Sequence, residues 1–135
     1  MLTSLDRLRP PALLLLRLAL GVIFIYHGFP KLFGDSALYT RSFVSYGLPA
    51  WLAYVAGIVE LFGGALLLLG LFTRVAALLL TASMAVALWK SHPGASLLAL
   101  NEYEFHLALL AGAFVLATTG AGAISLDFAI YRQKA

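Results

Sequence analysis

Hydrophobic residues dominate four stretches of the chain, each close to the length that crosses a lipid bilayer. A membrane-spanning helix needs roughly 20 consecutive apolar residues. The four stretches cover approximately residues 11–29, 49–71, 73–90 and 103–119. The turn from Gly70 to Arg74 is so short that the second and third helices must be antiparallel neighbours. The pattern predicts an all-α, integral membrane four-helix bundle that forms a single domain over residues 1–135.

The connection between the first and second stretches has a pattern of its own. Tyr39, Phe43 and Tyr46 recur at i, i+4 and i+7, with polar residues between them. This spacing places the three aromatic side chains on one face of a short helix lying at the membrane interface. Such a helix could form a lid over the outer mouth of the bundle. A plain extracellular loop is the alternative.

Composition places the chain outside the soluble proteins. Hydrophobic residues make up 62% of the 135 residues and charged residues 11%, against about 45–50% and about 25% in soluble domains. The chain has no basic face interleaved with aromatic residues, so nucleic acid is not expected as a partner. The absence of cysteine excludes thiol–disulfide exchange, cysteine-ligated iron–sulfur clusters and zinc–thiolate sites. We therefore expect no metal and no cofactor in the chain itself. We also expect no cleavable signal peptide, because no short polar region with a small-residue cleavage site follows the first apolar stretch.

Lysine and arginine residues predict the orientation of the bundle. One side carries Arg7, Arg9, Arg74, Arg132 and Lys134, and the other carries Lys31, Arg41 and Lys90. Because cytoplasmic segments carry an excess of positive charge, both termini are predicted to be cytoplasmic.

Glu60 lies near the middle of an otherwise apolar run, residues 48–72. A carboxylate at that depth is costly to insert and persists only where it faces a partner or a cavity. Ala53, Gly57 and Gly64 share its helical face, and small residues allow another helix to approach closely. Glu60 is therefore predicted to point into the bundle.

The first span supplies the expected partner. Arg17, Gly21, Phe24, Gly28 and Lys31 form one stripe, although Pro30 can break the helix before Lys31. At 1.5 Å per residue, Arg17 lies about 9 Å and Glu60 about 15 Å from the cytoplasmic ends of their helices. This predicts an ion pair between Arg17 and Glu60.

Two histidines are predicted to form a layer above this pair. His27 and His106 both lie about 3–5 Å from the outer ends of their helices, and about 10 Å above Glu60. The gap has room for a cavity or a bound molecule. Each polar residue also has a simpler interpretation: Arg17 can reach the headgroups, Glu60 can be purely structural, and the histidines can face lipid.

The candidate ligand-binding residues are therefore Arg17, His27, Lys31, Glu60 and His106. Arg74 and His92 are expected to be structural polar residues at span ends. No catalytic residue can be assigned from the pattern. A haem bound between His27 and His106 is an alternative to an organic ligand.

Three segments resemble one known family. Residues 17–32, RLALGVIFIYHGFPKL, resemble the first helix of the DoxX family of small bacterial membrane proteins. Residues 56–64, AGIVELFGG, with residues 69–74, LGLFTR, resemble its second helix and turn. Residues 120–127, GAGAISLD, resemble its C-terminal signature. The resemblance follows the chain in order over nearly its whole length.

The resemblance implies a multi-pass protein of the bacterial plasma membrane that is linked to quinone or other redox metabolism. The matching polar positions are Arg17, His27, Lys31, Glu60 and Arg74. The expected function is a quinone-linked or redox-associated membrane subunit that binds a small apolar ligand. The short C-terminal tail leaves no room for a soluble redox domain, so electrons are expected to come from a redox partner protein. The alternative is a structural or assembly subunit without ligand or catalysis.

Overall fold

The chain folds into long helices, and the described residues contain no strand. The computed structural model describes residues 2–91 and 100–131. A 3-10 helix, η1 (Leu2–Leu8), leads into the α-helices, which are α1 (Arg9–Phe33), α2 (Ser36–Ser45), α3 (Trp51–Leu69), α4 (Thr73–Ser91), α5 (Leu100–Thr119) and α6 (Leu126–Tyr131). The all-α fold predicted from the hydrophobic pattern is confirmed.

Three helical segments are long and apolar enough to cross a membrane. They are Ser4–Phe33, Trp51–Leu69 and Thr73–Lys90. The fourth predicted span coincides with α5, whose part Glu104–Thr119 is a shorter apolar helix. Pro30 does not end α1, which continues to Phe33. A proline this close to a helix end removes only one N–H donor, so Lys31 keeps its place on the helix.

Glycines bring α1 and α3 into close antiparallel contact. A Cβ atom at Gly21 would lie 2.8 Å from the carbonyl oxygen of Gly64, and one at Gly28 would lie 2.9 Å from that of Gly57. Neither contact leaves room for a methyl group, so the two backbones touch at both levels. The face of α3 predicted from Ala53, Gly57, Glu60 and Gly64 is buried, as expected.

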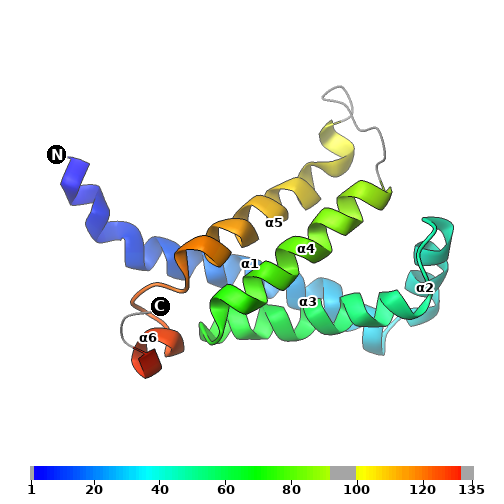
Figure 1. Cartoon of the computed structure of the whole chain (residues 1–135), viewed down its shortest axis with the longest axis horizontal. Coiled ribbons are helices and arrows are strands. Elements are labelled where there is room, and N and C mark those ends of the chain that lie inside the picture. Colours follow the sequence, from blue (N-terminus) through cyan, green and yellow to red (C-terminus); the bar gives the residue numbers. More distant parts are fainter. Residues whose placement is uncertain (1, 92–99, 132–135) are drawn as a thin grey trace.

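The second helix pair, α4 and α5, packs beside the first. Buried side chains from four helices form one apolar core, which includes Phe24, Leu67, Leu80 and Leu116. Figure 1 shows α3 and α4 joined by a tight turn and diverging from it, with α2 lying across the far end of α3. The bundle therefore has a narrow end at the turn and a wide end near α2.

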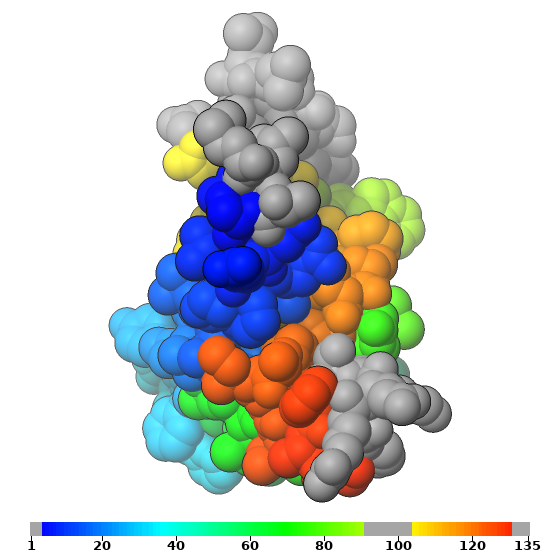
Figure 2. Space-filling view, turned by 90° about the vertical axis from the view of Figure 1, so that its left-hand side faces the viewer, coloured from blue at the N-terminus to red at the C-terminus, as the bar shows by residue number. Residues whose placement is uncertain are grey.

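The first and last described helices, η1 and α6, both lie toward the end of the bundle that holds the turn between α3 and α4 (Figure 1). Figure 2 looks at this end and shows the C-terminal segment lying against the first helical turns of the chain. Leu13 is in direct contact with this segment, since a Cβ atom at Gly122 would lie 3.1 Å from the side chain of Leu13. The C-terminal segment is thus part of the packed bundle.

Candidate functional site

A polar cluster surrounds the turn between α3 and α4, and we call it the turn cluster: Arg17, Arg74, Asp127 and the backbone groups they contact. Arg17 is its centre and is only 1% exposed. Its guanidinium donates to the carbonyl oxygen of Leu67 at 3.0 Å and to that of Ile124. Arg17 therefore ties α1 to the end of α3 and to the C-terminal segment.

Gly70 makes room for this arrangement. Its backbone has φ +67°, in the left-handed region that favours glycine, and it ends α3. A Cβ atom here would lie 2.2 Å from Nη1 of Arg17 and 2.6 Å from Cβ of Ser125. Both the conformation and the packing thus require glycine at this turn.

Asp127 caps the helix that follows the turn. Its carboxylate accepts hydrogen bonds from the backbone N–H of Phe72 at 2.7 Å and of Thr73 at 2.9 Å. Its own N–H donates to the carbonyl oxygen of Gly70 at 2.8 Å. A carboxylate at a helix N-terminus satisfies free N–H groups and complements the helix dipole. Asp127 also interacts electrostatically with the buried Arg17.

Arg74 caps the C-terminal end of α5. Its guanidinium donates to three carbonyl oxygens at the C-terminal end of that helix, those of Ala117 at 3.3 Å, Thr118, and Thr119 at 3.2 Å. A cation at this position complements the negative end of the helix dipole. In the turn cluster, therefore, each of the three charged side chains contacts backbone groups.

The predicted ion pair between Arg17 and Glu60 is wrong. The glycine contacts set Gly21 level with Gly64 and Gly28 level with Gly57. Arg17 is therefore level with the end of α3, near Leu67, and lies seven residues, or about 10 Å, from Glu60 along the helix. The depth estimate assumed that the cytoplasmic ends of the first two spans are level. It failed because the glycine contacts shift α1 along α3 relative to that alignment.

Glu60 pairs with Lys31 instead. The ammonium of Lys31 donates to Oε2 of Glu60 at 2.5 Å, and the two side chains are 12% and 3% exposed. The Lys31 ammonium also lies 5.6 Å from the centre of the Tyr39 ring, within reach of a cation–π interaction. The Lys31–Glu60 pair is the only ion pair among the described residues. It places two opposite charges on the wide half of the bundle.

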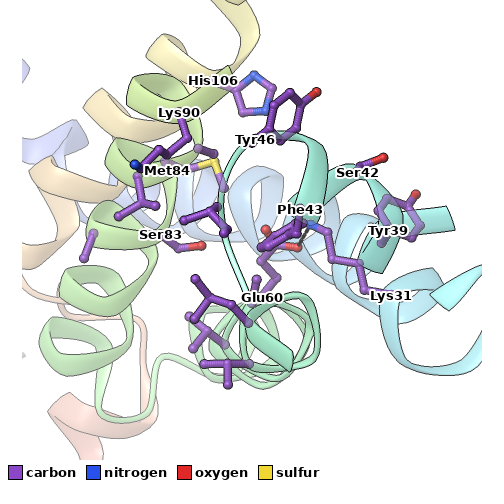
Figure 3. A pocket seen from close by; sticks show the side chains of 18 of the residues that line it. Lys31, Tyr39, Ser42, Phe43, Tyr46, Glu60, Ser83, Met84, Lys90 and His106 are labelled. Atoms are coloured by element: carbon purple, nitrogen blue, oxygen red, sulfur yellow. Dashed lines mark hydrogen bonds and ion pairs between the residues drawn. The ribbon is translucent and has the colours of Figure 1, made fainter. Parts of the chain in front are cut away.

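This pair lies in the wall of a cavity of about 470 Å³ (Figure 3). Apolar side chains from α3 and α4 make up much of the wall. The polar side chains that line it are Lys31, Tyr39, Ser42, Tyr46, Glu60, Ser83, Lys90 and His106. Cavities of about 300–1,000 Å³ with mainly apolar walls and a few polar groups are typical of sites for small organic molecules.

The short helix predicted between the first two spans is confirmed as α2. Tyr39 and Phe43 on this helix, and Tyr46 directly after it, all line the cavity. The shared aromatic face predicted from their spacing therefore turns toward the interior of the bundle. Together these side chains form the α2 side of the cavity wall.

The three histidines have different positions. His106 lines the cavity. His27 does not line it: its Nδ1 lies 2.8 Å from the carbonyl oxygen of Ile23, and its ring lies 5.3 Å from that of Phe105. The contact with Phe105, the residue before His106, puts the two histidines at similar levels. The predicted separation of about 10 Å between His27 and Glu60 is wrong, because a Cβ atom at Gly28, next to His27, would lie 2.9 Å from Cβ of Glu60. His92 lies outside the described residues.

The structure therefore sorts the predicted ligand-binding residues into two groups. Lys31, Glu60 and His106 line the cavity, whereas Arg17 and His27 do not. Asp127 and the cavity-lining Ser83 and Lys90 were not among the sequence candidates. Asp127 belongs to the C-terminal segment that resembles a family signature. No periodicity in the sequence indicates that it contacts the backbone of Phe72 and Thr73.

The arrangement can hold an uncharged organic molecule by one polar end. Lys31 has N–H donors beyond the one used on Glu60, and no hydrogen bond between the described residues reaches Oε1 of Glu60. A carbonyl oxygen could accept from Lys31 and a hydroxyl could donate to Glu60. The described residues contain no group of three or more histidine, aspartate or glutamate side chains placed to hold a metal ion.

Comparison with known proteins agrees with this architecture. The sequence pattern of the family named DoxX matches residues 12–93. The chain is 35% identical to a Bacillus subtilis protein named "Putative oxidoreductase CatD", over 90% of this chain and 88% of that protein. It is 37% identical to the Escherichia coli inner membrane protein YphA, over 88% of this chain and 90% of YphA. No solved structure matches the chain.

Proposed function

Because the chain belongs to the DoxX family of bacterial membrane proteins, we propose that it binds a small, mainly apolar molecule of the quinone class in the cavity between α2, α3 and α4. In this proposal it is a redox-associated protein of the bacterial inner membrane. Both of its termini lie in the cytoplasm, as the distribution of lysine and arginine predicts.

The observation that carries the proposal is the ion pair between Lys31 and Glu60 in the cavity wall. Two charges at this depth are costly unless their remaining hydrogen-bonding capacity is used. In the turn cluster the charged groups contact backbone carbonyl and N–H groups. At the cavity, the free donors of Lys31 and the free acceptor of Glu60 face a space large enough for a ligand.

A quinone matches these groups chemically. A carbonyl oxygen of the oxidised form accepts a hydrogen bond from Lys31, and a hydroxyl of the reduced form donates one to Glu60. The ring packs against the apolar walls and the aromatic side chains of Tyr39 and Phe43. The same pair of residues can thus hold the ligand in both oxidation states.

The redox association is supported by the name of the relative from Bacillus subtilis. The chain contains no cysteine, so thiol chemistry and cysteine-ligated clusters are not available to it. We therefore propose that a separate redox protein exchanges electrons with the bound quinone, while this chain positions it.

Equilibrium dialysis tests the proposal. The purified chain in nanodiscs of zwitterionic lipid is dialysed against a short-chain quinone, and empty nanodiscs correct for partitioning into lipid. We expect saturable binding that Lys31→Met weakens by roughly tenfold, because a hydrogen bond to a charged group is lost. Arg41→Gln is the control, since Arg41 is an exposed cation on α2 that does not line the cavity.

Absence of saturable binding across several quinones would contradict the proposal. The chain would then be better interpreted as a structural or assembly subunit. Binding that Lys31→Met and Arg41→Gln weaken equally would assign the effect to surface charge, and would also contradict a site at the ion pair.

A further inference from the structure

The cavity has two long walls, each formed by one stripe of a membrane-spanning helix. The residues of the α3 wall recur at helical spacing, and so do those of the α4 wall. These residues are Leu52, Val55 and Val59 on α3, and Leu79, Ala82, Val86 and Lys90 on α4. The two stripes line the same cavity. Figure 1 shows α3 and α4 diverging from their common turn.

Several of these wall residues are also exposed on the outside of the molecule. Val55 is 40% exposed, Leu79 is 52% exposed and Val86 is 39% exposed. A side chain that both lines a cavity and is exposed marks an opening. The opening therefore lies between α3 and α4, along the length of the helices.

The surroundings of this opening are apolar. Both helices are long and apolar enough to cross a membrane, so the opening faces hydrocarbon over most of its length. At the wide end of the bundle, Tyr39, Phe43 and Tyr46 line the cavity, and Tyr46 is 45% exposed. The cavity is thus bordered by aromatic side chains on the side of α2 and by exposed apolar side chains between α3 and α4.

We infer that the ligand is a long-tailed amphiphile dissolved in the membrane, which enters the cavity sideways between α3 and α4. Its polar head reaches the Lys31–Glu60 pair and its hydrocarbon tail stays in the opening, against Val55, Leu79 and Val86. This inference rests on the proposed function and adds to it the class of the ligand and its route. A tail in the opening covers apolar surface on both helices, which favours binding of the tailed molecule over its head alone.

Ala82 and Ala85 provide a matched pair for the test. Both are exposed alanines on α4, but Ala82 lines the cavity and Ala85 does not. A tryptophan at position 82 would occupy the opening, whereas one at position 85 would extend into lipid. Neither position belongs to the buried core, so both variants should fold.

The first experiment compares two quinones with the same head, one with a long alkyl tail and one without, by equilibrium dialysis in zwitterionic nanodiscs. We expect Ala82→Trp to weaken binding of the tailed quinone by roughly tenfold or more. The same change should weaken binding of the tail-less quinone by less than about threefold. Ala85→Trp should leave both affinities unchanged.

A second measurement uses the absence of cysteine in the chain. Ala82→Cys and Ala85→Cys each introduce a single thiol, whose modification by a lipid-soluble maleimide is timed. The tailed quinone should protect the thiol of Ala82→Cys and leave that of Ala85→Cys reactive. The tail-less quinone should protect neither.

The results separate this inference from the proposed function. Binding of the tailed quinone that is equal in Ala82→Trp and in the wild type, without protection of Ala82→Cys, overturns the lateral route but keeps the binding site. No binding of either quinone to the wild type overturns the proposed function itself. A change of oligomeric state in Ala82→Trp, measured by light scattering, would assign the opening to a contact between two copies and also overturn the inference.

Discussion

The two ends of the bundle use charged side chains in different ways. In the turn cluster, Arg17, Arg74 and Asp127 contact backbone groups and hold helix ends together. At the wide end, Lys31 and Glu60 contact each other and border a cavity. The two sets of charges therefore differ in what they border, which is backbone groups in the turn cluster and a cavity at the Lys31–Glu60 pair.

The two ends of the bundle also differ in how closely their side chains pack. The core side chains Leu67, Leu80 and Leu116 fill the space between the helices, and the turn cluster closes the narrow end beside them. Toward α2, α3 and α4 diverge and the cavity occupies the space between them. The narrow end is therefore closely packed, whereas the wide end contains an open space.

Arg17→Met is expected to cause the largest loss of stability. The substitution keeps a long side chain but leaves the carbonyl oxygens of Leu67 and Ile124 without their donor. We expect the free energy of unfolding to fall by about 3–5 kcal/mol, since buried partners of a charged group are left unsatisfied. Unfolding in mixed micelles with increasing SDS, followed by helicity, measures it. Arg41→Met is the control, and an equal loss in both variants would show that Arg17 is not a structural centre.

A smaller loss is expected from Asp127→Ala. The change removes the two hydrogen bonds that cap α4 at Phe72 and Thr73. The cost should be about 2 kcal/mol, at the upper end for a helix cap. Asp35→Ala is the matched control, because Asp35 precedes α2 without a side-chain cap hydrogen bond. Quinone affinity should be unchanged in Asp127→Ala, and a loss of affinity without a loss of stability would contradict a purely structural role for the turn cluster.

A double-mutant cycle tests the reassigned ion pair. Lys31→Met and Glu60→Gln should show a coupling of about 1–2 kcal/mol in unfolding free energy, because their side chains are in contact. Arg17→Met and Glu60→Gln should be additive, since their charged groups are in separate parts of the bundle. Coupling between Arg17 and Glu60 as large as that between Lys31 and Glu60 would restore the pair predicted from the sequence.

The sequence predicted the helices and the buried face of α3 because both depend on local periodicity. Ala53, Gly57, Glu60 and Gly64 recur at helical spacing, and all are buried. The pairing of Glu60 could not be obtained in the same way. It depends on the offset between α1 and α3, which the contacts of Gly21 with Gly64 and of Gly28 with Gly57 set.

The contact of Asp127 with the turn and the apolar lining of the cavity also depend on tertiary structure. Asp127 reaches the turn only because the short helix α6 folds back against it. Val55 and Val86 line the cavity, but in the sequence they resemble any lipid-facing residue of a membrane helix. Apolar walls and lipid-facing surface have the same composition, so no pattern distinguishes them.

The smallest effect, on quinone affinity, is expected from substitution of the histidines. The sequence analysis predicted the same role for His27 and His106. His106 lines the cavity, whereas His27 lies beside Phe105 and outside the cavity lining. We expect His106→Ala to weaken quinone binding by about threefold, as the loss of one neutral polar contact would. His27→Ala should leave the affinity unchanged, measured by the same dialysis. If His27→Ala weakened binding as much as His106→Ala, the ligand would have to extend past Phe105, and the cavity would be only part of the site.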